Sequence, residues 1–207
     1  MPRSVLQITT AIVWWCSWNS VYCQDTPQRL QPLLRAVAYL QDEVQQWPEQ
    51  HHCYSCHNNG DAARALFAAH SAGVTVPSQA INRTSDWLTK PGSWKNNGGD
   101  QRFSDQRLAQ FQFSLALAAA HRAALLSDPQ PLRQAAKATA RQQQADGSWA
   151  LDTGGIVASP ITYGRHLGTA LGKKLLQQVD PKTFSLHITR AEKWLRQSRP
   201  HAIPDLS

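Results

Sequence analysis

A helix-forming segment recurs four times along this chain, and its repetition constrains the fold more than any other feature of the sequence. Its copies are residues 35–40, 85–88, 135–140 and 190–195, and the aligned positions 39, 87, 138 and 194 are 48, 51 and 56 residues apart. Such steps are typical of proteins in which each repeat is one supersecondary unit. The segments are rich in Ala, Leu, Gln and Arg, without alternating β-branched residues, which predicts an all-α fold without strands.

Turn signals divide the repeats into pairs of helices. Trp47, Trp94 and Trp149 close the first three copies, and the last two follow Pro-Gly and Asp-Gly pairs, which break helices. These recurring tryptophans are expected to pack within the fold. A second helix, richer in small apolar residues, is expected after each turn, at residues 61–72, 104–126 and about 162–179. The chain should therefore form about three helical hairpins and one leftover helix at residues 190–199.

The third turn carries a resemblance to a known family. Residues 141–149, which end in Asp146-Gly147-Ser148-Trp149, resemble the Q-x-x-D-G-S-W repeat of squalene-hopene cyclases and prenyltransferase-like proteins, and residues 87–94 and 194–197 look like weaker copies. The resemblance implies an α/α toroid-like arc with the first helix of each hairpin outside and the second inside. Three and a half hairpins imply an incomplete arc, which a partner chain could complete.

The residues that would make this chain a cyclase or a prenyltransferase are not found in it. Cyclases of that family use a D-x-D-D stretch as proton source, which neither Asp42-Glu43 nor the isolated Asp100, Asp105 and Asp152 form. The prenyltransferase branch binds zinc through Asp, Cys and His from separate repeats, and that pattern does not map here either. Cyclase chemistry is therefore disfavoured, and the sequence does not settle whether the protein is an enzyme.

Residues Cys53-Tyr54-Ser55-Cys56-His57 have the C-x-x-C-H spacing at which a chain holds a c-type haem covalently. The two thiols form thioethers with the porphyrin vinyl groups, and the adjoining imidazole is an axial ligand of the iron. On a helical turn, Cys53, Cys56 and His57 would share one face. We expect these three residues to bind haem c, in a protein of electron transfer or redox sensing.

Other interpretations of the same residues stay open. Zinc could bind Cys53, Cys56 and His57 together with His51 or His52, although a distant second ligand pair is missing. The cysteines could also form a disulfide or a thiol redox pair, or have no chemical role. The main functional alternative is a non-catalytic binding or scaffold module of the prenyltransferase and squalene cyclase-like fold, with structural or zinc-binding cysteines.

The second axial position of such a haem has several candidates. The only methionine is Met1, so a distal histidine or an open position remains. His70, on the helix after the motif, and His121, on the long apolar helix, are preferred over His166 and His187. A bis-histidine iron suits electron transfer, whereas an open position suits ligand sensing or peroxide chemistry.

Residues 1–23 have the pattern of a cleaved signal peptide, with Arg3 before an apolar stretch and Val21-Tyr22-Cys23 at the cleavage site. The stretch is shorter than the roughly 20 apolar residues that span a bilayer, so no stable membrane span is expected. Residues 24–207 would then form one secreted or periplasmic domain whose only cysteines belong to the motif. The net charge of +7 comes from scattered basic residues, so we expect no nucleic-acid partner. A redox partner protein is implied but not identified.

Overall fold

A computed structural model describes residues 27–96, 98, 106–151 and 164–199, and the predicted signal peptide lies outside these ranges. All regular structure within them is helical, which confirms the predicted all-α class for the described part of the chain. The elements are α1 (Pro27–His51), the π-helical η1 (Cys56–Ala62), α2 (Ala63–Ser71), α3 (Ser78–Leu88), the 3₁₀-helical η2 (Pro91–Asn96), α4 (Gln106–Arg122), α5 (Gln130–Arg141), α6 (Arg165–Val179) and α7 (Ser185–Gln197).

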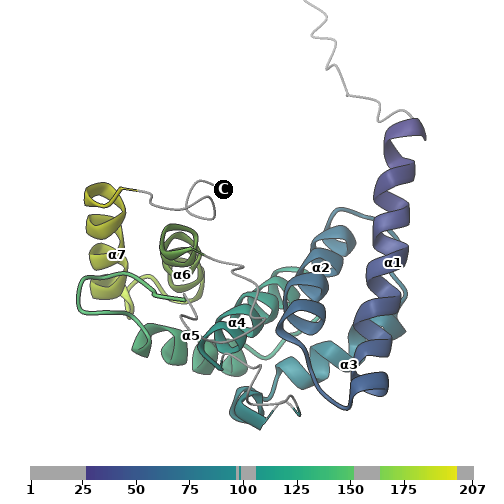
Figure 1. The fold of residues 1–207 in the computed structure, drawn as a ribbon, viewed down its shortest axis with the longest axis horizontal. Coiled ribbons are helices and arrows are strands. Elements are labelled where there is room, and N and C mark those ends of the chain that lie inside the picture. The colour runs from purple at the N-terminus through teal and green to yellow at the C-terminus, as the bar shows by residue number, and fades with distance from the viewer. Residues whose placement is uncertain (1–26, 97, 99–105, 152–163, 200–207) are drawn as a thin grey trace, which may run out of the picture.

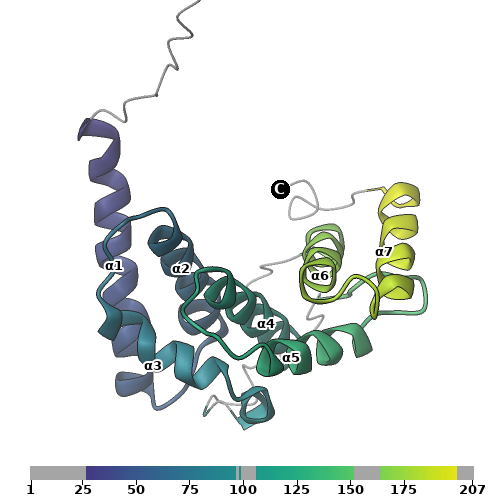
Figure 2. The same ribbon diagram turned by 180° about the vertical axis from the view of Figure 1, so that it is seen from behind.

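The helices follow the predicted order of hairpins. Figure 1 shows α1, α3, α5 and α7 along the outside of an open arc and α2, α4 and α6 along its inside, and Figure 2 shows the same order from behind. Helices of the same layer also pack on each other, α1 on α3, α2 on α4, and α4 on α6. Each hairpin therefore buries its faces against its neighbours, as repeat units do.

Helix α4 is the centre of the core. Every residue from Phe111 to Ala120 is buried, and α4 contacts η1, α2, α3, α5 and α6. A helix with buried residues on every face needs neighbours on all sides, which explains why the most Ala-rich segment takes the inner position. Phe111 and Phe113 are both fully buried and supply the bulk between the many alanines.

The Asp146–Trp149 turn joins the last three helices. Gly147 has a φ of +97°, and a Cβ at this position would lie 2.5 Å from the carbonyl oxygen of Arg190 in α7. Asp146 Oδ1 accepts hydrogen bonds from the Ser148 backbone N–H (3.0 Å) and hydroxyl (2.8 Å). Arg165 of α6 donates to Asp146 Oδ2 (2.9 Å). Only glycine fits this close approach at positive φ, so the turn is fixed by sterics and by charge.

Trp149 fills the space that this turn encloses. Its side chain is fully buried, and its indole Nε1 donates to the Thr139 carbonyl oxygen at the end of α5 (2.8 Å). Its backbone N–H donates to Thr169 Oγ1 in α6 (3.1 Å). A Cβ at Gly172 would lie 3.0 Å from the indole ring, so α6 approaches the ring through a glycine. The packing role predicted for this tryptophan is confirmed.

The ends of the arc differ from its middle in surface character. The large hydrophobic side chains that stay exposed among the described residues all lie on α1 or α7, and they are Leu30, Leu33, Leu34, Tyr39 and Leu186. Terminal repeats lack a neighbour on one side, and polar caps usually cover this face. No described helix, α1 included, has the length and apolar composition to cross a membrane.

Candidate functional site

The C-x-x-C-H motif occupies the connection between the first two helices. Helix α1 ends at His51, and His52 turns the chain with a φ of +53°. The next helix begins at Cys56, because Ser55 has the extended conformation of an N-cap and its Oγ accepts the backbone N–H groups of His57 (3.1 Å) and Asn58 (3.4 Å). Cys53 therefore precedes the helix, and the expectation that one helical turn carries all three residues is wrong.

A buried asparagine holds this loop in place. Asn59 is fully buried, and its Oδ1 accepts the Ser55 backbone N–H (3.1 Å). Its Nδ2 donates to the Val44 carbonyl oxygen in α1 (3.1 Å) and to Thr84 Oγ1 in α3 (2.8 Å). A buried amide is stable only when its polar atoms are paired, so this side chain fixes the motif relative to two outer helices. The sequence analysis missed Asn59; a polar residue opening an apolar helix was the available signal.

Two further contacts set the path of the chain around the motif. Gly60 is buried against α4, and a Cβ there would lie 3.2 Å from Gln112 Cβ. Gln112 also donates a hydrogen bond to Asp61, so the helix that starts at Cys56 docks on the middle of α4. On the other side, Gly98 lies against the His52 carbonyl oxygen and Cys53 with a φ of +85°.

An aromatic cluster borders the motif. Tyr54, between the two cysteines, stacks on Trp87 of α3 with ring centroids 4.2 Å apart and planes 4° apart. Trp87 meets the edge of Phe113 in α4 at 4.6 Å, and Trp94 lies 6.3 Å from Trp87. Trp94 is buried, which agrees with the packing role predicted for it, whereas Trp87 is half-buried. The aromatic residue of the motif thus anchors the loop in the core.

Cys53, Cys56 and His57 are the three residues of the motif expected to bind haem. Cys53 and Cys56 are half-buried and are not joined in a disulfide. No described residue forms a hydrogen bond with the His57 imidazole ring, which is also half-buried. Ser55, Asn59 and Tyr54 fix the backbone. Two unlinked thiols and an adjoining imidazole are the donor set that covalent haem attachment uses, so the residues present fit this group.

Zinc finds less support in this geometry. Within the described ranges, no group of three or more His, Cys, Asp or Glu residues is placed to hold a metal ion. A structural zinc site needs four convergent ligands, whereas a c-type haem needs only one of these three side chains at its metal. Cys53 lies outside the helix that carries Cys56 and His57. This separation makes it harder for the three side chains to converge on a zinc ion, whereas in a c-type haem only His57 has to reach the metal.

The two preferred distal histidines lie at the far end of the helices that carry them. His70 is in the last turn of α2, thirteen residues after His57, which corresponds to about 20 Å along a helix. His121 is in the last turn of α4. The ends of α2 and α4 lie side by side, since Ser71 and Arg122 line one cavity. This geometry argues against both residues as ligands of an iron bound at His57.

The remaining described histidines have other neighbours. His166 Nε2 lies 2.9 Å from Ser198 Oγ, and His187 Nδ1 lies 2.7 Å from Gln143 Oε1, both in the last part of the chain. His51 stacks on Trp47 with ring centroids 3.9 Å apart, and His52 is exposed. No distal ligand is therefore evident among the histidines that the structure describes.

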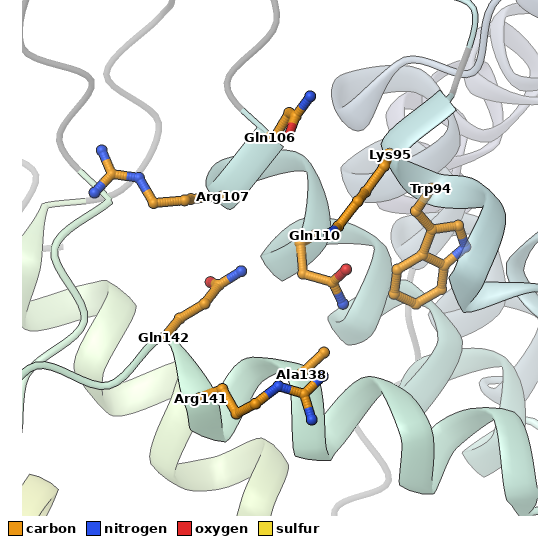
Figure 3. Close-up of a pocket in the computed structure, with 8 residues that line it drawn as sticks. All are labelled: Trp94, Lys95, Gln106, Arg107, Gln110, Ala138, Arg141 and Gln142. Carbon is orange, nitrogen blue, oxygen red and sulfur yellow. The ribbon is translucent and has the colours of Figure 1, made fainter.

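A separate cavity of about 270 Å³ lies between η2, α4 and α5 (Figure 3). Its residues include Trp94, Lys95, Gln110, Arg141 and Gln142, and none of them belongs to the motif.

Comparisons of the chain with known protein families, with curated proteins and with solved structures found no match.

Proposed function

We propose that this protein is an exported c-type haem protein of electron transfer or redox sensing. The observation that carries the proposal is the complete C-x-x-C-H sequence in a loop whose conformation is fixed by hydrogen bonds of Ser55 and Asn59, with both cysteines free of a disulfide. In such a loop, the thiols and the imidazole can bind a ligand while the hydrogen bonds of Ser55 and Asn59 keep the backbone in place. A haem bound there would supply one-electron chemistry at its iron.

Each residue of the motif has a distinct role in this proposal. Each thiol of Cys53 and Cys56 would add across one vinyl double bond, with its sulfur on one carbon and its hydrogen on the other. His57, in the first turn of the helix docked on α4, would ligate the iron. Ser55 and Asn59 keep the two thiols in position before attachment, because their hydrogen bonds already define the loop.

The position of the other histidines bears on which redox role is favoured. His70 lies about 20 Å from His57 along the helix, and His121 lies at the neighbouring end of α4, so a bis-histidine iron has no evident second ligand in the described part. An open distal side suits redox or ligand sensing better than simple electron transfer. Sensing is therefore the favoured form of the proposed function.

For the scaffold, we infer a shortened arc of the α/α toroid type found in squalene cyclase and prenyltransferase-like proteins. Alternating outer and inner helices support this inference, as does the Q-x-x-D-G-S-W segment with its glycine at the α7 contact and its tryptophan in the core. A partner chain that completes the arc is supported by the exposed leucines on α1 and α7. The molar mass of the protein in solution, from light scattering, tests the partner chain.

Coexpression with a bacterial haem-attachment system tests the proposed function. The purified chain should show a Soret band that survives denaturation. Cys56→Ala leaves one thiol, so at most one thioether can form and a smaller fraction of the haem should stay bound under denaturing conditions. Colourless protein with one equivalent of zinc would instead support the alternative, a scaffold or binding module with zinc-binding cysteines. Colourless protein without metal, from cells that mature a control cytochrome c, would contradict both metal-based interpretations.

A further inference from the structure

The N-terminal end of α1 extends beyond the helices that it packs on. Figures 1 and 2 both show the start of this helix projecting past α2. Every residue from Leu30 to Ala36 is exposed, and Val37 is the first buried side chain among those described. Most of the stability of a helix in a protein comes from the packing of its apolar face. We call residues 30–36 the projecting end.

Three leucines form an apolar stripe on the projecting end. Leu30, Leu33 and Leu34 expose 38%, 44% and 47% of their surfaces. Their spacing of three and four residues places them on one face of the helix, and Val37, seven residues after Leu30, continues this face into the core. The stripe is therefore the core-facing side of α1, continued past the point where the core ends.

The charge of the same segment is positive. Arg35 is exposed next to the stripe, and residues 27–41 contain two arginines and no carboxylate. The whole chain has a formal net charge of +7. Leucines on one face of a helix and arginine on the other are typical of helices that lie in the interface of a membrane, where anionic headgroups attract the basic side chains.

The loop beside the projecting end suits a lipid surface as well. Residues 72–77 connect α2 to α3 and contain no charged side chain, and both ribbon views show this connection passing beside α1. Ala72, Gly73, Thr75 and Pro77 are exposed. Moving a charge out of water is costly, so an uncharged loop can approach lipid more closely than a charged one.

A second copy of the chain is the competing partner for these leucines. Each leucine shows less than half of its surface, and their combined area is far below the about 1,200 Å² that a stable protein interface buries. Two projecting ends would also bring Arg35 of both copies together, and like charges repel. A lipid surface needs no matching partner area and supplies the opposite charge. We infer that the projecting end of α1 attaches the exported protein peripherally to an anionic lipid surface.

Sedimentation of the exported chain with lipid vesicles tests this inference. The chain should sediment with phosphatidylglycerol vesicles and not with phosphatidylcholine vesicles, and added salt should weaken the binding because it screens the charges. The protein used is the chain that begins near Gln24 by intact mass, so that no apolar leader takes part. No binding to phosphatidylglycerol, or equal binding to both lipids, would overturn the inference.

Single substitutions locate the binding on the helix. Leu34→Gln should weaken vesicle binding about tenfold, because it removes one leucine from the stripe. Arg35→Gln should weaken it about fivefold. Leu186→Gln is the matched control, since Leu186 exposes 60% of its surface on α7, and it should leave the binding unchanged. Equal losses in Leu34→Gln and Leu186→Gln would contradict the assignment to α1. Thermal melting checks that each variant is folded.

Two further measurements keep this inference apart from the other proposals. A dimer in light scattering that Leu34→Gln dissociates would assign the stripe to a second copy and overturn the lipid contact. The inference does not depend on haem, so the double variant Cys53→Ser with Cys56→Ser should bind the same vesicles equally well. Failure to find haem would therefore leave the lipid contact standing, and loss of vesicle binding in the double variant would contradict it.

Discussion

The C-x-x-C-H loop and the D-G-S-W turn are the two sharpest motifs of this chain, and the structure uses their residues in opposite ways. In the turn, polar atoms form hydrogen bonds within the protein, as those of Asp146, Ser148 and Trp149 do. Gly147 lies against α7. In the loop, the intervening Tyr54 and Ser55 make the holding contacts, while the thiols stay unlinked.

This difference is the one expected between a motif that stabilises the fold and a motif that binds a ligand, which is the role proposed for the loop. A motif that exists to hold the fold together has its side chains fully satisfied by neighbours, as Trp149 has. A motif that exists to bind something keeps reactive groups apart from the contacts that fix its backbone. Changes to the two motifs should therefore affect different observables, stability for the turn and haem content for the loop.

The largest expected effect concerns the cysteines. Replacing both Cys53 and Cys56 with serine should abolish covalent haem, because no other thiol lies in the motif. The Tm of the haem-free protein should change by only about 2 °C, since both side chains are half-buried and serine has nearly the same size as cysteine. Denaturing absorption spectra and calorimetry measure the two quantities. A collapse of the apo fold would show that the cysteines are structural after all.

The reverse result is expected for the turn. Trp149→Ala should lower the free energy of unfolding by about 3–5 kcal/mol, as it empties a fully buried indole site and leaves the Thr139 carbonyl unpaired. Trp149→Phe should cost less, because the ring is partly kept. The haem content per folded molecule should stay unchanged in both variants. Chemical denaturation and haem quantification on the same samples check this. A loss of haem without a loss of stability would contradict the separate roles given to the two motifs.

A change at Asn59 is expected to affect both the stability of the fold and the haem content. Asn59→Ala should cost about 2–3 kcal/mol, because it leaves the Ser55 N–H and the Val44 carbonyl without their buried partner. It should also reduce the yield of covalent haem by loosening the loop. Asn58→Ala is the matched control, as it removes one half-buried hydrogen bond to Glu43 and should cost under about 1 kcal/mol. Equal effects of the two variants would contradict the role given to Asn59.

The smallest effect is a pH dependence of the turn. Burial raises the pKa of Asp146, but the hydrogen bonds from the Ser148 backbone and hydroxyl and the charge of Arg165 outweigh it and bring the pKa below its ordinary value. The carboxylate therefore stabilises the native state above the unfolded pKa of about 4, and this contribution is lost as the pH falls through the lower folded pKa.

The Tm should consequently fall by about 2 °C more between pH 5 and pH 3 in the native sequence than in Asp146→Asn. Asp42→Asn changes an exposed acid on α1 and should leave the original slope. Calorimetry over that range gives both slopes. If Asp146→Asn leaves the slope of Tm against pH unchanged, the charge of Asp146 does not stabilise the turn.

Hydrophobic patterning and turn residues predicted most of the helices. Helices α2 and α6 end at or next to their predicted residues, because Gly73 and Asp180-Pro181 stop helices locally. Helix α4 instead ends at Arg122, four residues before the predicted end at 126, and Ala124 turns the chain with a φ of +56° ahead of the Asp128-Pro129 pair. Asp146-Gly147 marked a turn for the same reason. Such signals act over a few residues, so they can be recognised without knowledge of the tertiary fold.

The details of the motif depended on contacts that the sequence does not show. The start of the helix at Cys56 is decided by Ser55 and by Asn59, whose partners Val44 and Thr84 are 15 and 25 residues away. The place of His121 relative to the motif follows from α2 and α4 running side by side in one direction, whereas the distance of His70 could be predicted from its thirteen-residue separation along a helix. The start of the helix at Cys56 and the place of His121 are tertiary features, and periodicity within a helix carries no information on them.

The most direct test of the central claim is the intact mass of the chain purified after export from a host that matures c-type cytochromes. The proposed function predicts a polypeptide that begins near Gln24 and carries the added mass of one haem, retained under denaturing conditions. A mature chain at its bare polypeptide mass, with Cys53 and Cys56 both alkylated by iodoacetamide in the native protein, would contradict it.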